Sequence, residues 1–364
     1  MAEAGQLAGD GAAAGFTATV VGAYANQIDY CLNNDATITA RIVAAVAGLL
    51  DAPEPGPFLS RIRDWQGHAL ADAVPLRSAG ALHSLHLSGA APALAPIYAG
   101  ELADDIAIVG DVLRRHGETL LPWLDGPPQT NEAGRSSSFI AGLLHFAALG
   151  LPSRFECVEI GSSAGINLMI DRYRYDLGGV IVGPDDAAMH FAPEWRGAPP
   201  PPGPIAFAAL RGCDVAPLDL TDPAQALRLK AYIWPEHTVR FARLDAAITT
   251  ARQRKPDLVR MRAADFVEQQ LALPQAEGTT RVLMHSIVWQ YLPEDEKRRI
   301  TVAMEDAGQR ATPERALGWI ALEGNRVLLN HGLTLRHWPG SGEPELVAAA
   351  HAHGAWIEWR AASV

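Results

Sequence analysis

The sequence predicts a mixed α/β protein in which a helical segment is followed by a parallel β-sheet. From about residue 15 to 150, apolar side chains recur at helical spacing, as in residues 37–46. After Arg154, apolar strand-like runs alternate with helical patterns, which is typical of a parallel sheet with crossover helices. One of these runs ends at Glu159 and is followed by a glycine-containing loop. Together these observations predict a helical subdomain over residues 1–150 and a Rossmann-like sheet over residues 151–364.

Proline-rich breaks and apolar runs give the expected elements. Prolines interrupt the helical segment at 51–57 and 125–128, and we find no strand pattern in that segment. In the second segment we expect strands at 155–160, 205–213, 258–262, 281–286, 317–323, 333–338 and 355–359. We expect helices at 223–229, 238–254, 265–273, 293–310 and 343–353. Residues near 178–204, which include four consecutive prolines, predict an insertion that loops over one face.

Composition limits the class of protein and its partners. Of 364 residues, 48% are hydrophobic and 20% charged, which is typical of a globular chain. A net charge of -11, with no cluster of Lys and Arg, argues against a nucleic-acid partner. The three cysteines are widely spaced, which fits a reducing cytoplasm rather than a disulfide framework. No secretory signal pattern and no apolar run of about 18 residues is found, so we expect no membrane association.

The loop after Glu159 has the residue types that hold a nucleotide-like ligand at the edge of a parallel sheet. Gly161 and Gly165 would let the backbone turn tightly and let a ligand approach closely. Ser162 and Ser163 would add hydroxyl donors. We therefore predict a ligand site here.

This loop resembles the first motif of class I S-adenosylmethionine (SAM) dependent methyltransferases, with Ser163 in place of the middle glycine. The resemblance implies that SAM is the cofactor, that Glu159 faces its ammonium group, and that Asn167 caps or bridges. Asp214, after the second strand, would accept the ribose hydroxyls. Asp265 would accept the adenine amino group, with the neighbouring apolar Phe266 against the ring.

The same resemblance places the methyl acceptor near the fourth strand, where His285, Ser286, Gln290 and Tyr291 would line the reaction site. The polar run 129–135 is expected at the start of a helix, and the helical subdomain is expected to cover the ligand crevice. Within that run Gln129, Asn131 and Arg135 are candidate substrate-binding residues. The candidates for a general base are Glu132, His285 and Tyr291.

Over nearly its whole length the chain also resembles a bacterial family catalogued only as a domain of unknown function. The segments that carry this resemblance are 129–135, 159–168, 171–175, 194–197 and 234–236. Methyl transfer to a small or medium acceptor is the function we expect. Near the C-terminus, Trp356 and Trp359 are expected to pack or to mediate self-association into a homo-oligomer.

Other interpretations of the same residues stay open. The protein would also fit a sensor or assembly module that binds SAM or a related nucleoside without turnover. Residues 161–165 match the Gly-x-Ser-x-Gly elbow of serine hydrolases, with Ser163 as nucleophile, or a purely structural turn. Asp214 and Asp265 would alternatively be helix N-caps, since Asp is favoured there on backbone grounds alone. The pair His351 and His353 predicts no metal site, because residues two apart do not share a helix face.

Overall fold

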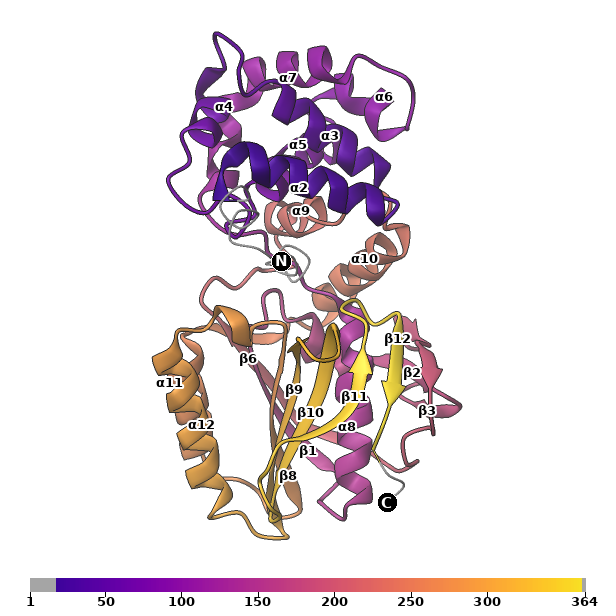
Figure 1. Cartoon of the computed structure of the whole chain (residues 1–364). Helices are drawn as coiled ribbons and strands as arrows, with labels where there is room; N and C mark the ends of the chain where they lie inside the picture. The colour runs from indigo at the N-terminus through magenta and orange to yellow at the C-terminus, as the bar shows by residue number, and fades with distance from the viewer. Residues whose placement is uncertain (1–17, 362–364) are drawn as a thin grey trace. The chain divides into compact units, whose positions relative to one another are not determined.

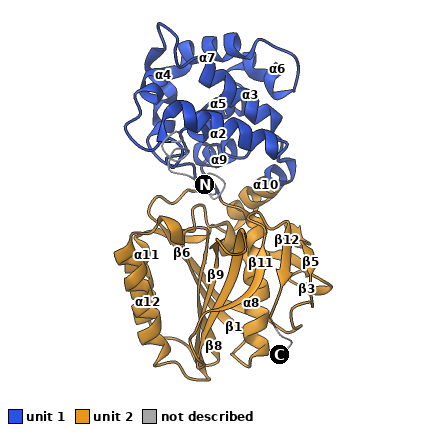
Figure 2. Cartoon of the chain, in the orientation of Figure 1, with its two compact units in different colours: residues 1–130, 222–242 blue, residues 131–221, 243–364 orange. Residues whose placement is uncertain are grey.

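The computed structural model describes residues 18–361, which form two compact units (Figures 1 and 2). Unit 1 comprises residues up to 130 together with 222–242, and unit 2 comprises 131–221 together with residues from 243 onward. The division therefore falls near residue 130 rather than 150, and a later segment joins the helical unit. The N-terminal stretch in which we found no signal pattern lies outside the described residues.

Unit 1 is helical, as its apolar spacing predicts. Its α-helices are α2 (Val20–Asn33), α3 (Thr37–Gly48), α4 (Gly56–Arg63), α5 (Val74–Leu87), α6 (Ala95–Tyr98), α7 (Asp105–Leu120) and α9 (Pro223–Ala231). The apolar faces of α2 to α7 share one core that includes Tyr24, Ile42 and Phe58, and α9 packs against α5. The Glu236 carboxylate accepts hydrogen bonds from the backbone N–H groups of Ile38 and Thr39, at 2.6 and 2.9 Å. Segment 234–236 thus helps to cap α3.

Unit 2 contains a nine-stranded sheet in the order β5-β12-β11-β10-β9-β8-β1-β6-β7. The strands are β1 (Arg154–Ile160), β5 (Glu194–Arg196), β6 (Ala206–Asp214), β7 (Asp257–Arg260), β8 (Thr279–Ser286), β9 (Arg315–Asn325), β10 (Asn330–Trp338), β11 (Glu345–Ala350) and β12 (Trp356–Trp359). The run β7-β6-β1-β8-β9 is parallel throughout. Strands β10, β11 and β12 continue it as an antiparallel meander.

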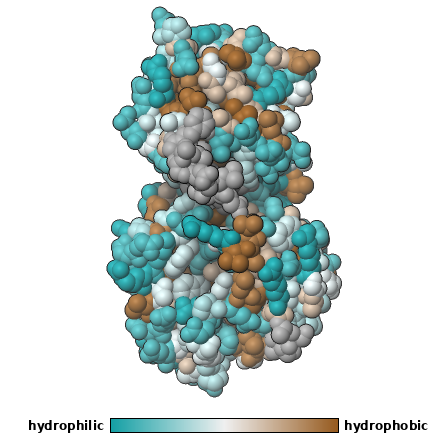
Figure 3. Space-filling model, in the orientation of Figure 1, coloured by the Kyte–Doolittle hydropathy of each residue, from teal (hydrophilic) through white to brown (hydrophobic). Residues whose placement is uncertain are grey.

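Helices cover both faces of this sheet (Figure 1). The helices α11 (Ala263–Ala272) and α12 (Glu294–Gly308) pack on one face, and α8 (Ser136–Ala148) packs on the other. The pleat of β9 shows the division, because Trp319 shares a core with α12 while a Cβ on Gly318 would meet Phe146 of α8 at 2.6 Å. On the face drawn in Figure 3, hydrophilic side chains cover much of the outer side of α11 and α12.

The seven predicted strands are all present, and α9, α10 (Thr238–Gln253), α11 and α12 confirm the predicted helices at their positions. The helix predicted at 343–353 is wrong, because this stretch forms β11. Its alanines favour a helix locally, but pairing with β10 and β12 decides the outcome.

The stretch after β1 also differs from the prediction. The glycine loop opens onto a short 3-10 helix, η4 (Ile166–Arg172), and not onto an α-helix. A three-stranded sheet follows, built from β2 (Tyr173–Leu177), β3 (Val180–Val182) and β4 (Met189–Phe191). The predicted insertion is therefore folded rather than a plain loop, since β5 from the same stretch joins the large sheet beside β12.

Single residues complete the fold. The cysteines Cys31, Cys157 and Cys213 are buried, and none of the three is in a disulfide bond. Trp359 stacks on Trp195 with ring centroids 5.8 Å apart, and Trp356 lies against the Arg196 guanidinium, so both predicted C-terminal tryptophans pack within unit 2. No helix in the described part of the chain is long and apolar enough to cross a membrane.

Candidate functional site

The strand order places a pocket at the point where the sheet changes direction. From β1 the chain adds β6 and β7 on one side and β8 and β9 on the other. Ligands of open α/β sheets bind at the carboxyl ends of the strands at such a point. A pocket of about 390 Å³ lies there, lined by Gly161 after β1, Asp214 at the end of β6, Met261 after β7, and Val288 and Tyr291 after β8. Four neighbouring strands therefore supply its walls.

The glycine loop forms the end of this pocket nearest β1. Gly161 and Gly165 have φ values of 67° and 71°, which glycine adopts without strain. A Cβ on Gly161 would meet the Val288 side chain at 2.3 Å, and a Cβ on Gly165 would meet Pro256 at 2.8 Å. Close packing therefore also requires glycine at both positions. Ser163 has a φ of 51°, so it occupies a backbone conformation suited to the glycine that it replaces.

Asp214 ties β6 to the glycine loop. One carboxylate oxygen accepts a hydrogen bond from the Ser163 N–H at 2.9 Å, and the other accepts from the Ala216 N–H at 2.8 Å. Each carboxylate oxygen has a second lone pair. The Asp214 side chain, which lines the pocket, can therefore accept further hydrogen bonds from a ligand.

Glu159 is buried at the end of β1 with an incomplete set of partners. Its side chain is only 2% exposed. One oxygen, Oε1, accepts from the Asn167 amide at 2.8 Å, while Glu159 Oε2 and Asn167 Oδ1 are buried without hydrogen-bond partners among the described residues. Burial raises the pKa of Glu159 to about 7. These two unpaired acceptors, one of them a carboxylate oxygen, are suited to a cationic donor.

The polar run 129–135 reaches this loop through Asn131. Its side-chain oxygen accepts a hydrogen bond from the Ile166 N–H at 3.0 Å, so the segment is anchored where η4 begins. Arg135 is 7% exposed and donates from Nε to the Ala352 carbonyl at 2.8 Å. Gln129 belongs to unit 1, and its substrate-binding role stays a prediction.

Further polar side chains lie along the same sheet edge on the β9 side. Glu323 is close to the end of β9, and His331 opens β10, where it pairs with Gly324 and Ala350 in register. His331 Nδ1 is buried without a hydrogen-bond partner among the described residues. Burial, and then the charge of Arg135, lower the pKa of His331 to about 4, so its imidazole is neutral at pH 7. We call Arg135, Tyr291, Glu323 and His331 the acceptor edge.

Glu323 Oε1, unlike Glu159 Oε2, has several hydrogen-bond partners. It accepts from His285 Nδ1 at 2.7 Å and from the N–H groups of Val288 and Trp289 at 3.1 and 3.2 Å. These bonds hold the turn after β8, where Ile287 has a φ of 53° that is strained for a β-branched residue.

The three candidate bases have partners or are protonated near neutral pH, and their role as bases stays a prediction. Both ring nitrogens of His285 are occupied, because Nδ1 contacts Glu323 and Nε2 accepts from Trp319 Nε1 at 2.9 Å. Glu132 forms an ion pair with Arg243 at 3.1 Å and also accepts from the Gly134 N–H. Burial raises the pKa of Tyr291 to about 12, so the phenol stays protonated near neutral pH. Its hydroxyl accepts from the exposed Gln290 side chain at 2.9 Å.

Two predicted adenine contacts do not reach the pocket. Asp265 lies in the first turn of α11 and pairs with Arg299 at 2.7 Å, with about half of its side chain exposed. Phe266 is fully buried in the core between α11 and the sheet. Arg262 and Glu296 line that end of the pocket instead, joined by an ion pair of 2.7 Å.

Ser162 serves the loop rather than the ligand. It is fully buried, its hydroxyl donates to the Glu159 carbonyl at 3.1 Å, and its N–H donates to the Cys213 carbonyl at 3.0 Å. Ser286 ends β8 and is 9% exposed.

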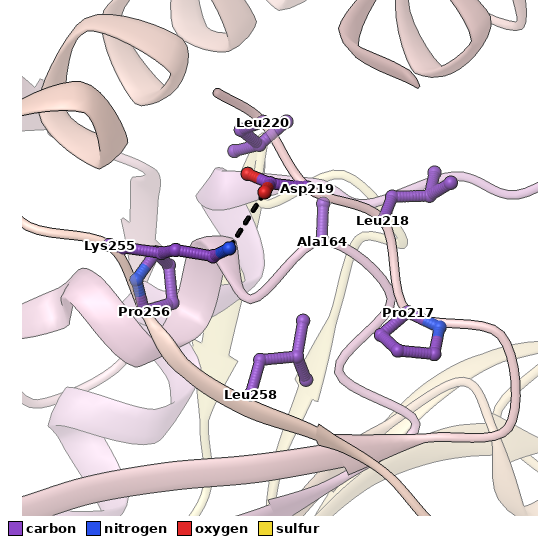
Figure 4. Close-up of a pocket in the computed structure, with 8 residues that line it drawn as sticks. All are labelled: Ala164, Pro217, Leu218, Asp219, Leu220, Lys255, Pro256 and Leu258. Atoms are coloured by element: carbon purple, nitrogen blue, oxygen red, sulfur yellow. Dashed lines mark hydrogen bonds and ion pairs between the residues drawn. The ribbon is translucent and has the colours of Figure 1, made fainter. Parts of the chain in front are cut away.

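A second pocket lies on the other side of the glycine loop (Figure 4). Its volume is about 120 Å³, and Lys255 Nζ and Asp219 Oδ2 face each other across it at 2.7 Å. The hydrogen bond from Lys255 lowers the pKa of Asp219 to about 2. With its charges already paired, this pocket is the weaker candidate. Within residues 18–361, no group of three or more His, Cys, Asp or Glu side chains could hold a metal ion.

Sequence reasoning missed Glu323, His331, Arg262 and Glu296. Glu323 ends a correctly predicted strand, so the preference of ligands for carboxyl ends of strands was a sufficient signal. His331 had no such signal, because only the antiparallel pairing of β10 brings its first residues to this edge.

The comparisons with known proteins bear on the family alone. A family model described as an uncharacterized protein conserved in bacteria, DUF2332, matches residues 22–359. Neither the curated proteins nor the solved structures gave a match. Because the family model covers nearly the whole chain, the protein belongs to the DUF2332 family.

Proposed function

We propose that unit 2 binds SAM in the pocket at the end of β1 and transfers its methyl group to a small or medium acceptor. The observation that carries this proposal is the pocket of about 390 Å³ formed after β1, β6, β7 and β8, with the Asp214 carboxylate in its wall. The parallel order β7-β6-β1-β8-β9 supports it, because class I methyltransferases, which the glycine loop resembles, bind their cofactor after the corresponding strands.

The residues of the pocket fit the nucleoside part of SAM. The free lone pairs of Asp214 suit the two ribose hydroxyls. Met261, Val288 and Leu292 provide apolar walls for an adenine ring, and the Arg262 guanidinium suits its face. Asp265 has no part in this arrangement.

The buried groups beside the pocket fit the methionine part. Glu159 Oε2 and Asn167 Oδ1 are unpaired acceptors that an ammonium group would satisfy. An ammonium ion also favours the ionised form of Glu159, whose pKa of about 7 reflects burial without a cation in contact. The loop residues therefore orient the cofactor from both ends.

When bound, SAM supplies a methyl group on a positively charged sulfur. The work of the chain is then to hold this group in line with the acceptor and to exclude water, and such positioning supplies a large part of the acceleration. Asp214 would hold the ribose and Glu159 the ammonium, while Tyr291 belongs both to the pocket wall and to the acceptor edge.

Calorimetry with SAM and with its demethylated product, S-adenosylhomocysteine, tests the proposal. We expect binding of both, and Asp214→Asn should weaken it about tenfold, because a charged acceptor to two hydroxyls is lost. Asp257→Asn is the matched control, because Asp257 begins β7 at the opposite end of the sheet and pairs with Arg211. Absence of binding by the unmodified protein would refute the proposal.

One observation favours a second function, that of a binding module without turnover. The candidate bases His285, Glu132 and Tyr291 are engaged or protonated, which such a module would also show. Binding of SAM without methyl transfer to any acceptor offered would support this alternative.

A serine hydrolase is less well supported. Ser163 Oγ is buried and has no hydrogen-bond partner, so no histidine of the described residues activates it. Labelling of Ser163 by a fluorophosphonate would reverse this judgement.

A further inference from the structure

The acceptor edge indicates what kind of molecule receives the methyl group, and this step rests on the proposed function. The first observation concerns the side chains that could remove a proton from the acceptor, namely whether they are already bonded or protonated. Within residues 18–361, His285 has both nitrogens occupied, Glu132 is ion-paired and Tyr291 is protonated at neutral pH. Glu159 lies beside the glycine loop, where the proposed contact with the ammonium group of SAM would occupy it. The sequence-predicted bases are therefore not ready to take a proton, and Glu323 Oε1 already accepts three hydrogen bonds.

The ordinary pKa values of possible acceptors show which of them would need a base. Phenols, amines and thiols have pKa values of about 10, 10.4 and 8.5, so each is largely protonated at pH 7 and needs a base. A carboxylic acid, with a pKa of about 4, is already an anion with a lone pair to offer. A site whose predicted bases are occupied or protonated fits an acceptor that needs no base, such as a carboxylate.

Two groups of the acceptor edge, Arg135 and His331, are suited to a carboxylate. Arg135 is only 7% exposed, and its Nε bond to the Ala352 carbonyl fixes its guanidinium just after the end of β11. His331 pairs in register with Ala350, which precedes Ala352 by two residues. Its Nδ1 is buried without a hydrogen-bond partner among the described residues. Guanidinium is the group best shaped for a carboxylate, and a neutral imidazole can donate a second hydrogen bond to it.

We propose that the methyl acceptor is a carboxylate, held by Arg135 and His331, and that the product is its methyl ester. One carboxylate oxygen attacks the methyl carbon, the new C–O bond forms as the C–S bond breaks, and the electron pair of the broken bond stays on sulfur. The anion and the sulfonium become a neutral ester and a neutral thioether. No proton is transferred.

Binding of simple carboxylates to the full chain tests this proposal without SAM. The probes are benzoate and hexanoate, each compared with its neutral amide at pH 7, and the readout is the imidazole NMR signal of His331. His331→Gln assigns that signal. We expect saturable shifts with the carboxylates and none with the amides. Arg135→Gln should weaken the carboxylate effect at least tenfold.

The controls lie at the other end of the same strands. Arg315→Gln, at the exposed start of β9, and His337→Gln, near the end of β10, should leave carboxylate binding unchanged. If Arg135→Gln unfolds, Arg135→Lys should keep the charge and lose most of the affinity, because the planar fork is lost. Equal shifts with carboxylate and amide, or no shift with either carboxylate, would overturn the proposal.

A turnover assay then separates this proposal from the proposed function. With SAM present, we expect a base-labile methyl ester by mass spectrometry. Methylation of alcohols or amines in preference to carboxylates would overturn the carboxylate proposal and leave methyl transfer intact. Failure to bind SAM, with carboxylate binding retained, would refute the proposed function. The carboxylate site would then remain, without a methyl donor.

Discussion

Two glutamates at the same edge of the sheet have opposite surroundings. Glu159 ends β1 with one oxygen paired to Asn167 and the other without a partner. Glu323, near the end of β9, accepts from the His285 ring and from two backbone N–H groups. Both would be nominated by their position alone. Their hydrogen bonds separate a carboxylate suited to a ligand from one that holds the scaffold.

This difference matters because an unpaired buried acceptor is costly. A buried polar atom without a partner loses the hydration it had in the unfolded chain, and proteins keep few such atoms. Several of them, on Glu159, Ser163, Asn167 and His331, lie at the same edge of one unit. We interpret this cost as the counterpart of ligand binding, and variants at the two glutamates test that interpretation.

The largest effect is expected from Glu159→Gln. The folded-state pKa of about 7 lies above the ordinary 4.5, so folding takes up a proton between these values. The resulting stability is complete below pH 4.5 and is lost as the pH rises through 7. At pH 8 the buried charge costs roughly 3 kcal/mol, which the neutral amide should recover. Chemical denaturation from pH 5 to 8 would measure it, and the pH dependence should largely disappear in the variant.

The same substitution should remove ligand binding. Without the charge that pairs with an ammonium, we expect a loss of SAM affinity of at least 100-fold by calorimetry. A variant that is more stable and inactive would show the trade between stability and function. A variant that is more stable and still binds SAM normally would show that Glu159 does not face the cofactor.

Glu323→Gln should lower the unfolding free energy, whereas Glu159→Gln should raise it. The amide oxygen can still accept, but three hydrogen bonds lose their charge assistance, and a loss of about 2 kcal/mol of unfolding free energy is expected. Thermal and urea unfolding at pH 7 would measure it. SAM affinity should fall less than in Glu159→Gln. A variant with unchanged stability would break the contrast between the two carboxylates.

Ser163→Gly should stabilise the loop by about 1 kcal/mol. A left-handed φ costs a non-glycine residue about 1–2 kcal/mol, and the Ser163 hydroxyl makes no hydrogen bond that would be lost. Ser162→Gly is the control, because Ser162 is not among the positive-φ residues and its hydroxyl is bonded, so it should destabilise. Equal effects of both variants on the urea midpoint would refute the strain at Ser163.

The comparison also explains what the sequence could predict. The strand ending at Glu159, the glycines and Asp214 form a local pattern, and the structure brings them together at one pocket. Arg135 and Asn131 were proposed from polarity alone, and Asn131 does contact the loop. The neighbours of Arg135 were not predictable, because Ala352 and His331 reach this edge only through the β10 to β12 meander.

The wrong helix and the unforeseen partners of His285 share a physical cause. Alanine-rich residues near 348 have a helical preference that sheet pairing overrides, and no local pattern records that pairing. His285 was a sound candidate by position, but Trp319 and Glu323, from a neighbouring strand, occupy both of its nitrogens. Such saturation depends on contacts between distant residues.

The smallest effect is expected from Asp265→Asn, which tests the adenine contact that the motif implied. Asp265 is about half exposed, and its partner Arg299 also pairs with Glu268 at 2.7 Å, so the guanidinium keeps a carboxylate when Asp265 is neutralised. Exposed ion pairs contribute about 0.5 kcal/mol, and we expect a change in unfolding free energy no larger than that. SAM affinity should stay within twofold of the unmodified protein in the same calorimetric series as Asp214→Asn. A tenfold loss of SAM affinity would instead indicate that the adenine ring lies against α11. The proposal that it lies beside Arg262 and Glu296 would then be wrong.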